Sequence, residues 1–581
     1  MKYVQAKLYR HLRSAFLCLA MVFSLAITAA PNQDPGQNLV DNYIEAWVDF
    51  YPSAAYAYGD LDSAASFEAF TESRNKQWLA FNKTTAIKAQ ALLDADTTAP
   101  SLRVDLQVLL AQTQNELANW SEDSPMTEQP QWYAEQISQA LTSLLIRDQL
   151  SEQGRTKALL ARLVGVQQLC DNGIANIIGG NSMRTDTALR TLQGTKTFYA
   201  GNLKTLTAAW PEANGLTSID KTIDLTVKAL ERLERHLREK ILPDAVTNAG
   251  IGVDRYSAKL ARRTSNLYTP ESLLREADEE MNAVKALMLK QAKRWKASLA
   301  TSIGSEKDLL NAAIEAMEQD RENNSADFLD SFRLITAESG AFVEEHNLAT
   351  VPKPTTLTIA LSPAHFSGAA VGGVYPTGPF SPEANTIFYV PSVADSADEM
   401  VKEGFYRSFN THFNTMIMSH EMYPGHYLQY KVAVSEAPAV RSLFANGSYV
   451  EGWGSFSEEL MLDAGWANDA PLTRLAHLRK RLENATRAYV SVQVNTAQWG
   501  EQQVLTFARE EGLLAPQFAK NLWQRVVNSP MQITDYFTGY QHFKRLFNDY
   551  VTSSPKAEVK PWVDAVLQTG PVPPVMLDEL L

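Results

Sequence analysis

Most of the first 350 residues carry apolar side chains at helical spacing, separated by short polar breaks. In residues 222–242 the apolar positions recur every three or four residues, with charged residues between them, and Pro243 ends the run. This spacing places the apolar side chains on one face of a helix. A further helix is expected to begin at Thr269, which caps it, and Pro270, which suits its first turn. The same pattern predicts helices over residues 133–150, 155–175, 306–319 and 325–346.

The pattern changes near residue 351, where two strand-like runs replace the helical stripes. Residues 357–361 alternate Leu and Ile with Thr and Ala, as expected of a half-buried strand. A glycine-rich stretch follows and ends in a second strand-like run at residues 386–390. Helical patterns resume over residues 398–550. The pattern therefore predicts a mainly α-helical protein with a small β-sheet.

The chain shows no repeat of fixed period and no long linker. Its 581 residues are enough to bury one large core. We therefore expect residues 31–581 to form a single large, mainly helical domain. Within it, residues 31–350 form a helical part, and residues 351–581 form the part that carries the candidate chemistry.

The N-terminus, residues 1–30, is predicted to be a secretory signal peptide. Four basic residues precede an apolar run that begins at Ser14 and ends in small residues. This is the layout of an export signal, with cleavage expected within residues 26–30. An uncleaved membrane anchor is the alternative. Lipid attachment at Cys18 is disfavoured, because Leu17 stands where a small residue is required.

Removal of this segment leaves an acidic chain, with 49 Lys and Arg against 66 Asp and Glu, a net charge of −17. Such a surface repels nucleic acid, so we exclude nucleic-acid binding. Charges interrupt the apolar runs elsewhere, so we expect no stable membrane insertion after signal removal. Only Cys170 remains, so an intrachain disulfide is excluded. We expect a protein exported to the periplasm or secreted, whose oligomeric state the sequence does not indicate.

The segment MSHEMYPGHYLQY, residues 418–430, contains His420, Glu421 and His426. It nearly matches the zinc-binding pattern H-E-x-x-H, in which two histidines four residues apart share a helix face. Here the step is six residues, which turns His426 by about 240° on an unbroken helix. Because proline disrupts a helix interior, the helix must end, kink or bulge at Pro424. The segment is therefore either a metal site, if the break returns His426 towards His420, or a plain Pro-Gly helix end.

A second segment, YVEGWGSFSEELML, favours the metal site. Glu451, Ser455 and Glu458 fall on one face of a predicted helix whose other residues are largely apolar. Two histidines and a carboxylate are a donor set that zinc accepts. We expect Glu451 to be the third metal ligand and Glu458 to support the ligands. The alternative is that both carboxylates lie on a solvated or purely structural face.

Together the two segments closely resemble the bacterial family called domain of unknown function 885, whose members carry H-E-x-x-P-G-H and then E-G-W-x-x-Y-x-E. Residues 373–390, ending in TIFYV, resemble a strand-forming segment of that family. Residues 529–539, SPMQITDYFTG, are similar to its P-G-Q-A-x-x-Y-x-x-G segment. The likeness covers most of the chain. It implies a large helical body similar to metallopeptidases of the angiotensin-converting-enzyme and neurolysin type, with the small sheet near the active cleft.

The resemblance implies an exported zinc-dependent hydrolase, with a peptide or another small molecule as substrate. One zinc ion would be held by His420, His426 and Glu451. Glu421 would be the general base, and Tyr536 would donate to the oxygen that gains charge in the transition state. The residues expected to bind substrate or support the site are Glu458, Arg487, Tyr389, Tyr540 and His542.

Three lesser expectations accompany this assignment. The glycine-rich residues 367–380 are expected to border the cleft. The strand at residues 386–390 is expected to pair with an extended substrate. His412 is expected to make an ordinary hydrogen bond rather than bind metal.

One departure from the family keeps other functions open. The family carries an Arg-x3-Asp-x3-His array, whereas here Arg487 is followed by Ser491 and Asn495. In addition, Gly500 follows Trp499 instead of preceding it. These changes favour an alternative, a non-catalytic exported peptide-binding protein on a peptidase scaffold. A hydrolase of a non-peptide amide or ester is a third hypothesis.

Overall fold

The computed structural model describes residues 34–581 except 96–97, 209, 211–215, 299–303, 364–371 and 554–556. The predicted signal peptide, and part of the glycine-rich stretch, lie outside the described residues. The described chain is mainly helical with one small sheet, as predicted.

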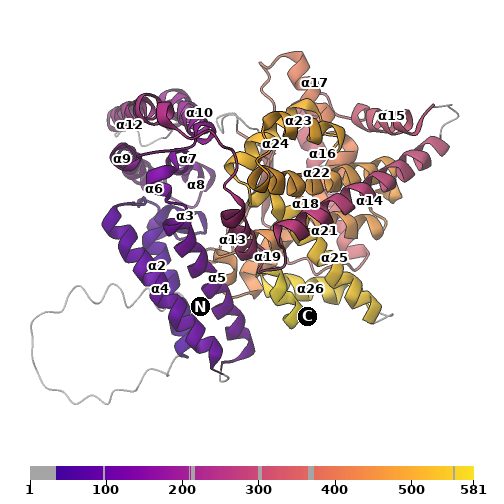
Figure 1. The fold of residues 1–581 in the computed structure, drawn as a ribbon, viewed down its shortest axis with the longest axis horizontal. Helices are drawn as coiled ribbons and strands as arrows, with labels where there is room; N and C mark the ends of the chain where they lie inside the picture. Colours follow the sequence, from indigo (N-terminus) through magenta and orange to yellow (C-terminus); the bar gives the residue numbers. More distant parts are fainter. Residues whose placement is uncertain are drawn as a thin grey trace, which may run out of the picture.

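The N-terminal helices form pairs and small layers, with α4 packed on α5, α7 on α10 and α9 on α12. Their bounds are α2 Pro35–Phe50, α3 Pro52–Ala57, α4 Glu72–Asp94, α5 Pro100–Ser121, α6 Pro125–Glu128, α7 Pro130–Gln139, α8 Thr142–Ile146, α9 Glu152–Asn176, α10 Ser182–Phe198, α11 Lys204–Ala208 and α12 Leu216–His236. In Figure 1 this group occupies one side of the molecule.

The middle of the chain crosses to the other side of the molecule (Figure 1). The capping predicted at Thr269 is confirmed, since its side chain accepts a hydrogen bond from the backbone N–H of Ser272. The predicted helices at residues 306–319 and 325–346 are confirmed as well. The bounds are α13 Val253–Arg263, α14 Pro270–Ala297, α15 Glu306–Gln319 and α16 Ser325–Glu345.

The sheet has three strands in the order β1-β3-β2. β1 (Leu357–Leu361) runs parallel to β3 (Thr386–Val390), and β2 (Gly373–Tyr375) runs antiparallel to it. The two strands predicted from alternation are confirmed. The expectation that β3 pairs with a substrate is wrong, because both of its edges already carry a neighbouring strand.

The C-terminal helices surround the predicted chemistry, with α22 packed on α14 and α21 packed on α25. Their bounds are α17 Glu399–Ser408, α18 Thr411–Glu421, α19 His426–Glu436, α20 Ala439–Leu443, α21 Gly447–Asp463, α22 Pro471–Thr496, α23 Glu501–Glu510, α24 Pro516–Asn528, α25 Asp535–Ser553, α26 Val559–Thr569 and α27 Leu577–Leu580. One hydrophobic cluster includes buried side chains from both the N-terminal and the C-terminal helices.

The helix predicted over residues 133–150 is divided in two, which corrects the sequence-based prediction. α7 ends at Gln139 and α8 begins at Thr142. The buried guanidinium of Arg162, on α9, donates a hydrogen bond of 2.8 Å to the carbonyl of Ala140. The carbonyl of Ala140 therefore accepts a hydrogen bond from another helix at the point where α7 ends.

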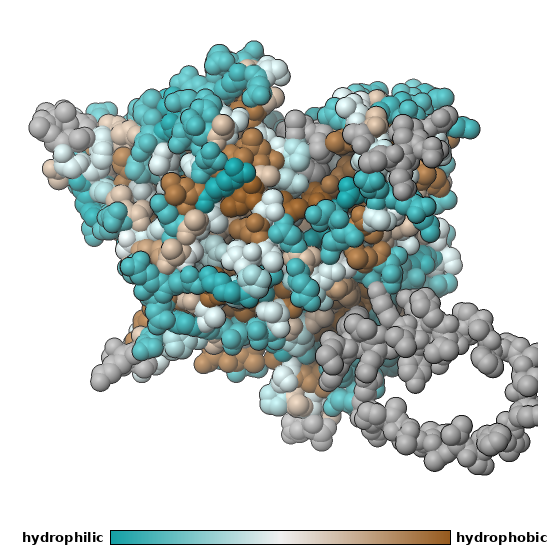
Figure 2. Space-filling view, turned by 180° about the vertical axis from the view of Figure 1, so that it is seen from behind, coloured by the Kyte–Doolittle hydropathy of each residue, from teal (hydrophilic) through white to brown (hydrophobic). Residues whose placement is uncertain are grey.

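Hydrophilic residues cover most of the face drawn in Figure 2, and hydrophobic residues gather towards its middle. Cys170 is a free, buried thiol. Within the described residues, no helix combines the length and the apolarity that a bilayer crossing requires.

Candidate functional site

The helix break at Pro424 is present as predicted. α18 ends at Glu421 and α19 begins at His426, so the helix does not run through the Pro-Gly pair. The chain turns so sharply that a Cβ added to Gly425 would lie 1.9 Å from the carbonyl oxygen of His420. Only glycine permits this approach, which brings the second histidine back beside the first.

Helix α21 holds the break in place. The indole N–H of Trp453 donates a hydrogen bond of 2.9 Å to the carbonyl of Pro424. The next residue is Gly454, and a Cβ there would lie 2.7 Å from ring atoms of His420. The Gly-Trp-Gly sequence of α21 therefore provides both a tether for the turn and the space for the imidazole.

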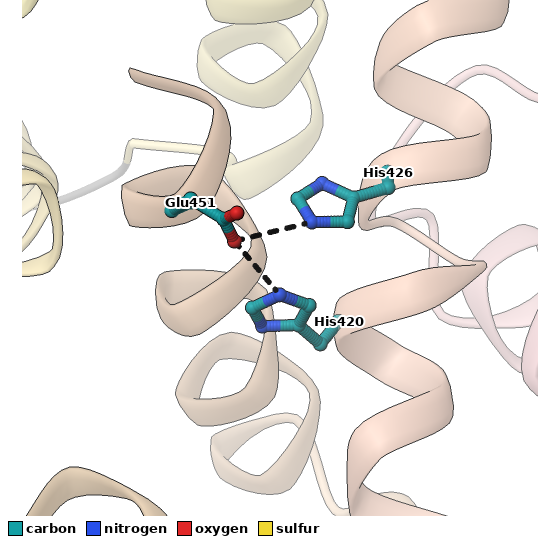
Figure 3. Close-up of side chains that lie close together, drawn as sticks. All are labelled: His420, His426 and Glu451. Carbon is teal, nitrogen blue, oxygen red and sulfur yellow. Dashed lines mark ion pairs between the residues drawn. The ribbon is translucent and has the colours of Figure 1, made fainter. Parts of the chain in front are cut away.

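His420, His426 and Glu451 converge, as Figure 3 shows. Oε2 of Glu451 lies 3.6 Å from Nε2 of each histidine, and the potential ligand atoms all lie within 4.8 Å of one another. Ligand atoms placed 2.0–2.2 Å from one zinc ion in tetrahedral geometry are separated by about 3.4 Å. The two oxygen-to-nitrogen distances are close to this value, so these three side chains could hold a single metal ion such as zinc. Both histidines are buried, whereas the Glu451 side chain is 21% exposed.

Glu458, the predicted supporting residue, is fully buried beneath this group. Its two carboxylate oxygens accept hydrogen bonds from Nδ1 of His420 (3.0 Å) and Nδ1 of His477 (2.9 Å). A proton on Nδ1 leaves the Nε2 lone pair of His420 directed at the site, and this is how a supporting carboxylate orients a ligating imidazole. Nδ1 of the other converging histidine, His426, lies 3.3 Å from Oε1 of Gln429.

The carboxylates give the site a strongly negative potential. Burial by itself lowers the pKa of His420, but hydrogen bonds with Glu451 and Glu458 outweigh burial and raise this pKa to about 10. Burial likewise opposes ionisation of Glu451, yet its contacts with the two histidines hold its pKa well below the usual range. A potential that binds a proton this firmly also favours a divalent cation at the same point.

Two tyrosines flank the histidines. The ring of Tyr536 lies nearly parallel to that of His420, with 6.4 Å between the ring centres. The ring of Tyr430 lies 6.0 Å from that of His426. Burial, followed by the charge of Glu451, raises the pKa of Tyr536 to about 12 and also raises that of Tyr430. Both phenols therefore remain protonated hydrogen-bond donors at neutral pH.

The predicted general base, Glu421, is the last residue of α18 and is partly exposed. It contributes to the negative potential at the site, because its charge is among those that raise the pKa of His420 and of Tyr430, after the larger effects of burial and of the nearer carboxylates.

The remaining predicted residues have other partners. Arg487 lies over the ring of Tyr536, at 5.0 Å, and is therefore part of the site's surroundings. Tyr540 donates its hydroxyl hydrogen to Glu459, and His542 lies between Arg545 and Asp578. The Tyr389 ring is 5.4 Å from that of Tyr375 in the sheet. His412 makes the expected ordinary hydrogen bond, at 2.9 Å to Thr473.

Ser491 and Asn495, which depart from the family array, are buried structural residues. The Ser491 hydroxyl hydrogen-bonds the phenol of Tyr256 and donates to the carbonyl of Pro530, both at 2.8 Å. The Asn495 amide donates to the carbonyl of Ser491 and accepts a hydrogen bond from the backbone N–H of Ile251. Their hydrogen bonds fix the loops around residues 251 and 530.

A cavity of about 560 Å³ lies between the N-terminal and C-terminal helices, and the residues that line it do not include His420, His426 or Glu451. Trp47 of α2 and Gln112 of α5 line one side, and Gly447 of α21 and Gln532 line the other. The amide of Gln532 also lies 3.4 Å from the hydroxyl of Tyr536. The cavity therefore extends to within one side chain of Tyr536.

Sequence reasoning missed Tyr430 and His477. Tyr430 follows His426 by four residues on a helix, so its position on the same face was available from the spacing. His477 stands on α22, and no spacing in the sequence links it to Glu458 on α21.

Replacing Gly454 with alanine is expected to weaken zinc binding, because the added methyl group would push the His420 ring out of its position. We expect the loss of affinity to be about 10–100-fold, the size of the effect when a metal-binding histidine loses its supporting partner. The matched control is Gly404→Ala on α17, where an added Cβ meets no atom within 4 Å. That control should bind zinc normally and gain up to about 1 kcal/mol of stability from helix propensity. Competition titration with a chelating dye measures both affinities, and equal affinities would contradict the close packing at His420.

Comparison with known proteins identifies the family and the fold. Residues 52–581 match the family model described as "Bacterial protein of unknown function (DUF885)". The comparison with curated proteins gave no match. A solved structure of a candidate lipoprotein of unknown function from Shewanella oneidensis is similar, with 20% identity, a TM-score of 0.78 and coverage of 94% of this chain and 99% of that chain. A candidate lipoprotein from Colwellia psychrerythraea has 15% identity, a TM-score of 0.75 and coverage of 94% and 98%. At such identities the likeness concerns the fold alone.

Proposed function

The chain belongs to the DUF885 family of bacterial proteins, and from this premise we propose that it is an exported zinc-dependent hydrolase that cleaves peptide bonds. The observation that carries the proposal is the convergence of His420, His426 and Glu451. The basic and then apolar layout of residues 1–30 supports export. The helical body around the site supports an architecture of the angiotensin-converting-enzyme and neurolysin type.

The chain's own residues have distinct roles in this proposal. His420, His426 and Glu451 would hold one zinc ion, which when bound supplies Lewis acidity and lowers the pKa of a coordinated water. Glu421 takes a proton from the attacking water and passes it to the leaving amine. The hydroxyls of Tyr536 and Tyr430 donate to the oxygen that gains negative charge in the transition state.

The test is zinc content together with substrate class. The purified mature chain is expected to contain about one zinc per molecule, as one such site requires, and to hydrolyse members of a peptide library faster than matched acyl esters and non-peptide amides. A well-folded chain that takes up no zinc would overturn the proposal. A zinc-loaded chain that binds peptides without cleaving them would instead support the non-catalytic binding protein, and preference for the esters or non-peptide amides would support the third hypothesis.

A further inference from the structure

Three cationic side chains surround the ring of Tyr536. Nζ of Lys480 and the guanidinium carbons of Arg487 and Arg525 lie 5.8, 5.0 and 5.9 Å from the ring centre. Lys480 and Arg487 come from α22 and Arg525 comes from α24, so the fold gathers them from two helices. We call these three residues the cationic subsite.

The cationic subsite has more positive charge than its described partners neutralise. One carboxylate, Glu483, pairs with both Lys480, at 3.2 Å, and Arg487. The guanidinium of Arg525 donates a hydrogen bond of 2.7 Å to the neutral amide of Gln532. The side chains of Lys480, Arg487 and Glu483 are only 14%, 9% and 19% exposed. Charges held away from water in this way are costly unless paired, so the arrangement favours a further anion.

Repulsion among the cations also favours binding of a further anion. Burial, followed by the charge of Arg487, lowers the pKa of Lys480, although Glu483 and Glu458 act in the opposite direction. The pKa of Glu483 itself is lowered to about 2, because the favourable charges of Arg487 and Lys480 outweigh its burial. Glu483 is therefore fully ionised at neutral pH, and it still leaves the group with an excess of positive charge.

The position of the cationic subsite limits which anion it receives. Tyr536 is a neighbour of both groups, since its ring centre lies 6.4 Å from that of His420 and 5.0 Å from the guanidinium carbon of Arg487. The His420 ring and the Arg487 guanidinium are therefore separated by no more than the length of about three extended residues. Gln532, which contacts both Arg525 and Tyr536, also lines the neighbouring cavity, so this one side chain separates the cavity from the subsite.

We propose that the cationic subsite binds the free C-terminal carboxylate of a peptide substrate, so that the protein cleaves close to the carboxyl end of short peptides. The inference rests on the proposed function and adds the substrate class to it. Arginine suits this role, because its planar guanidinium matches a carboxylate in a bidentate geometry. The alternative is that the cationic subsite binds the carboxylate of an acidic side chain within a longer peptide.

Three peptides of one sequence test the proposal: one with a free C-terminal carboxylate, one with a C-terminal amide, and one amidated peptide whose last residue is replaced by Glu. The free carboxylate is expected to raise kcat/KM over the plain amide by about tenfold to a hundredfold, the range for hydrogen bonds to charged groups. Equal values for the free acid and the amide would overturn the proposal. A Glu-ending amide that matches the free acid would assign the subsite to acidic side chains and would overturn it as well.

Variants locate the effect. Arg525→Gln is expected to reduce the preference for the free carboxylate about tenfold, the effect of losing one charged partner. The matched control, Arg479→Gln, lies on the same helix as Lys480, but its guanidinium pairs with Glu318 at 2.9 Å, and this control should keep the full preference. An Arg525→Gln variant with unchanged preference would contradict a role for the cationic subsite.

Binding separates this inference from the proposed function. The Glu421→Gln variant, titrated calorimetrically with the three peptides, reports carboxylate recognition while turnover is slowed by a factor of about 10²–10⁴. Preference for the free acid in this titration, together with no hydrolysis by the wild type, would uphold the subsite while overturning the peptidase. Hydrolysis by the wild type with no preference in either assay would uphold the peptidase and overturn the subsite.

Discussion

Glu421→Gln is expected to lower kcat by a factor of about 10²–10⁴, the usual contribution of a positioned general base. Glutamine keeps the size and polarity of the side chain, but its amide cannot accept a proton from water. Glu421 is the last residue of α18, next to His420, and is partly exposed. Because it is not among the three converging ligands, the variant should retain one zinc ion and normal stability.

The control for this change is Glu436→Gln, which alters an exposed glutamate at the last position of α19. Steady-state kinetics and elemental analysis on the same preparations give turnover and zinc content together. If Glu421→Gln turned over peptides at the wild-type rate, Glu421 would be excluded as the base. If Glu421→Gln lost zinc, its rate would carry no information on base catalysis. The rate of a Glu421→Asp variant that retains zinc would then show whether Glu421 is the base.

His420→Ala is expected to remove zinc from the protein altogether. Loss of a supporting partner costs about 10–100-fold in metal affinity, and loss of a ligand itself should cost more. The change also leaves Glu458 with His477 as its remaining histidine partner, so some loss of thermal stability is expected with it.

His412→Ala is the matched control for this second variant. His412 lies on the same helix, α18, but its contacts are with Thr473 and Asp320. Elemental analysis after dialysis should find about one zinc per chain in the control, as for a single such site, and none in His420→Ala. Circular dichroism checks that both remain folded. A folded His420→Ala protein that keeps its zinc would remove this residue from the ligand set.

The sequence predicted the elements whose signal is local. Alternation located β1 and β3, and capping located the start of α14, because each depends on a few consecutive residues. β2 was missed, since Gly373–Tyr375 is too short to show alternation. The break between α7 and α8 coincides with a carbonyl that Arg162 binds from another helix, and no local pattern carries that information.

In the candidate site, too, the features with a local sequence signal were predicted and those that depend on packing between helices were missed. The break at Pro424 follows from the chemistry of proline, and the return of His426 to His420 was an expectation that the structure confirms. Lys480 and Arg525 escaped notice because their common neighbour, Tyr536, lies on a third helix. The sequence alone does not show that Lys480, Arg487 and Arg525 all lie against the ring of Tyr536, because this depends on how the helices pack.

Helix α21 makes the site a single thermodynamic unit. Within eight residues it provides a carboxylate for the histidines, the indole that tethers the turn, the space for one imidazole and the carboxylate beneath it. A displacement of this helix changes all four contacts together, so a site in which only some of them form gains little stability. Occupancy of the site and docking of α21 therefore favour one another reciprocally, and a ligand bound there raises the free energy of unfolding of the C-terminal helices around it.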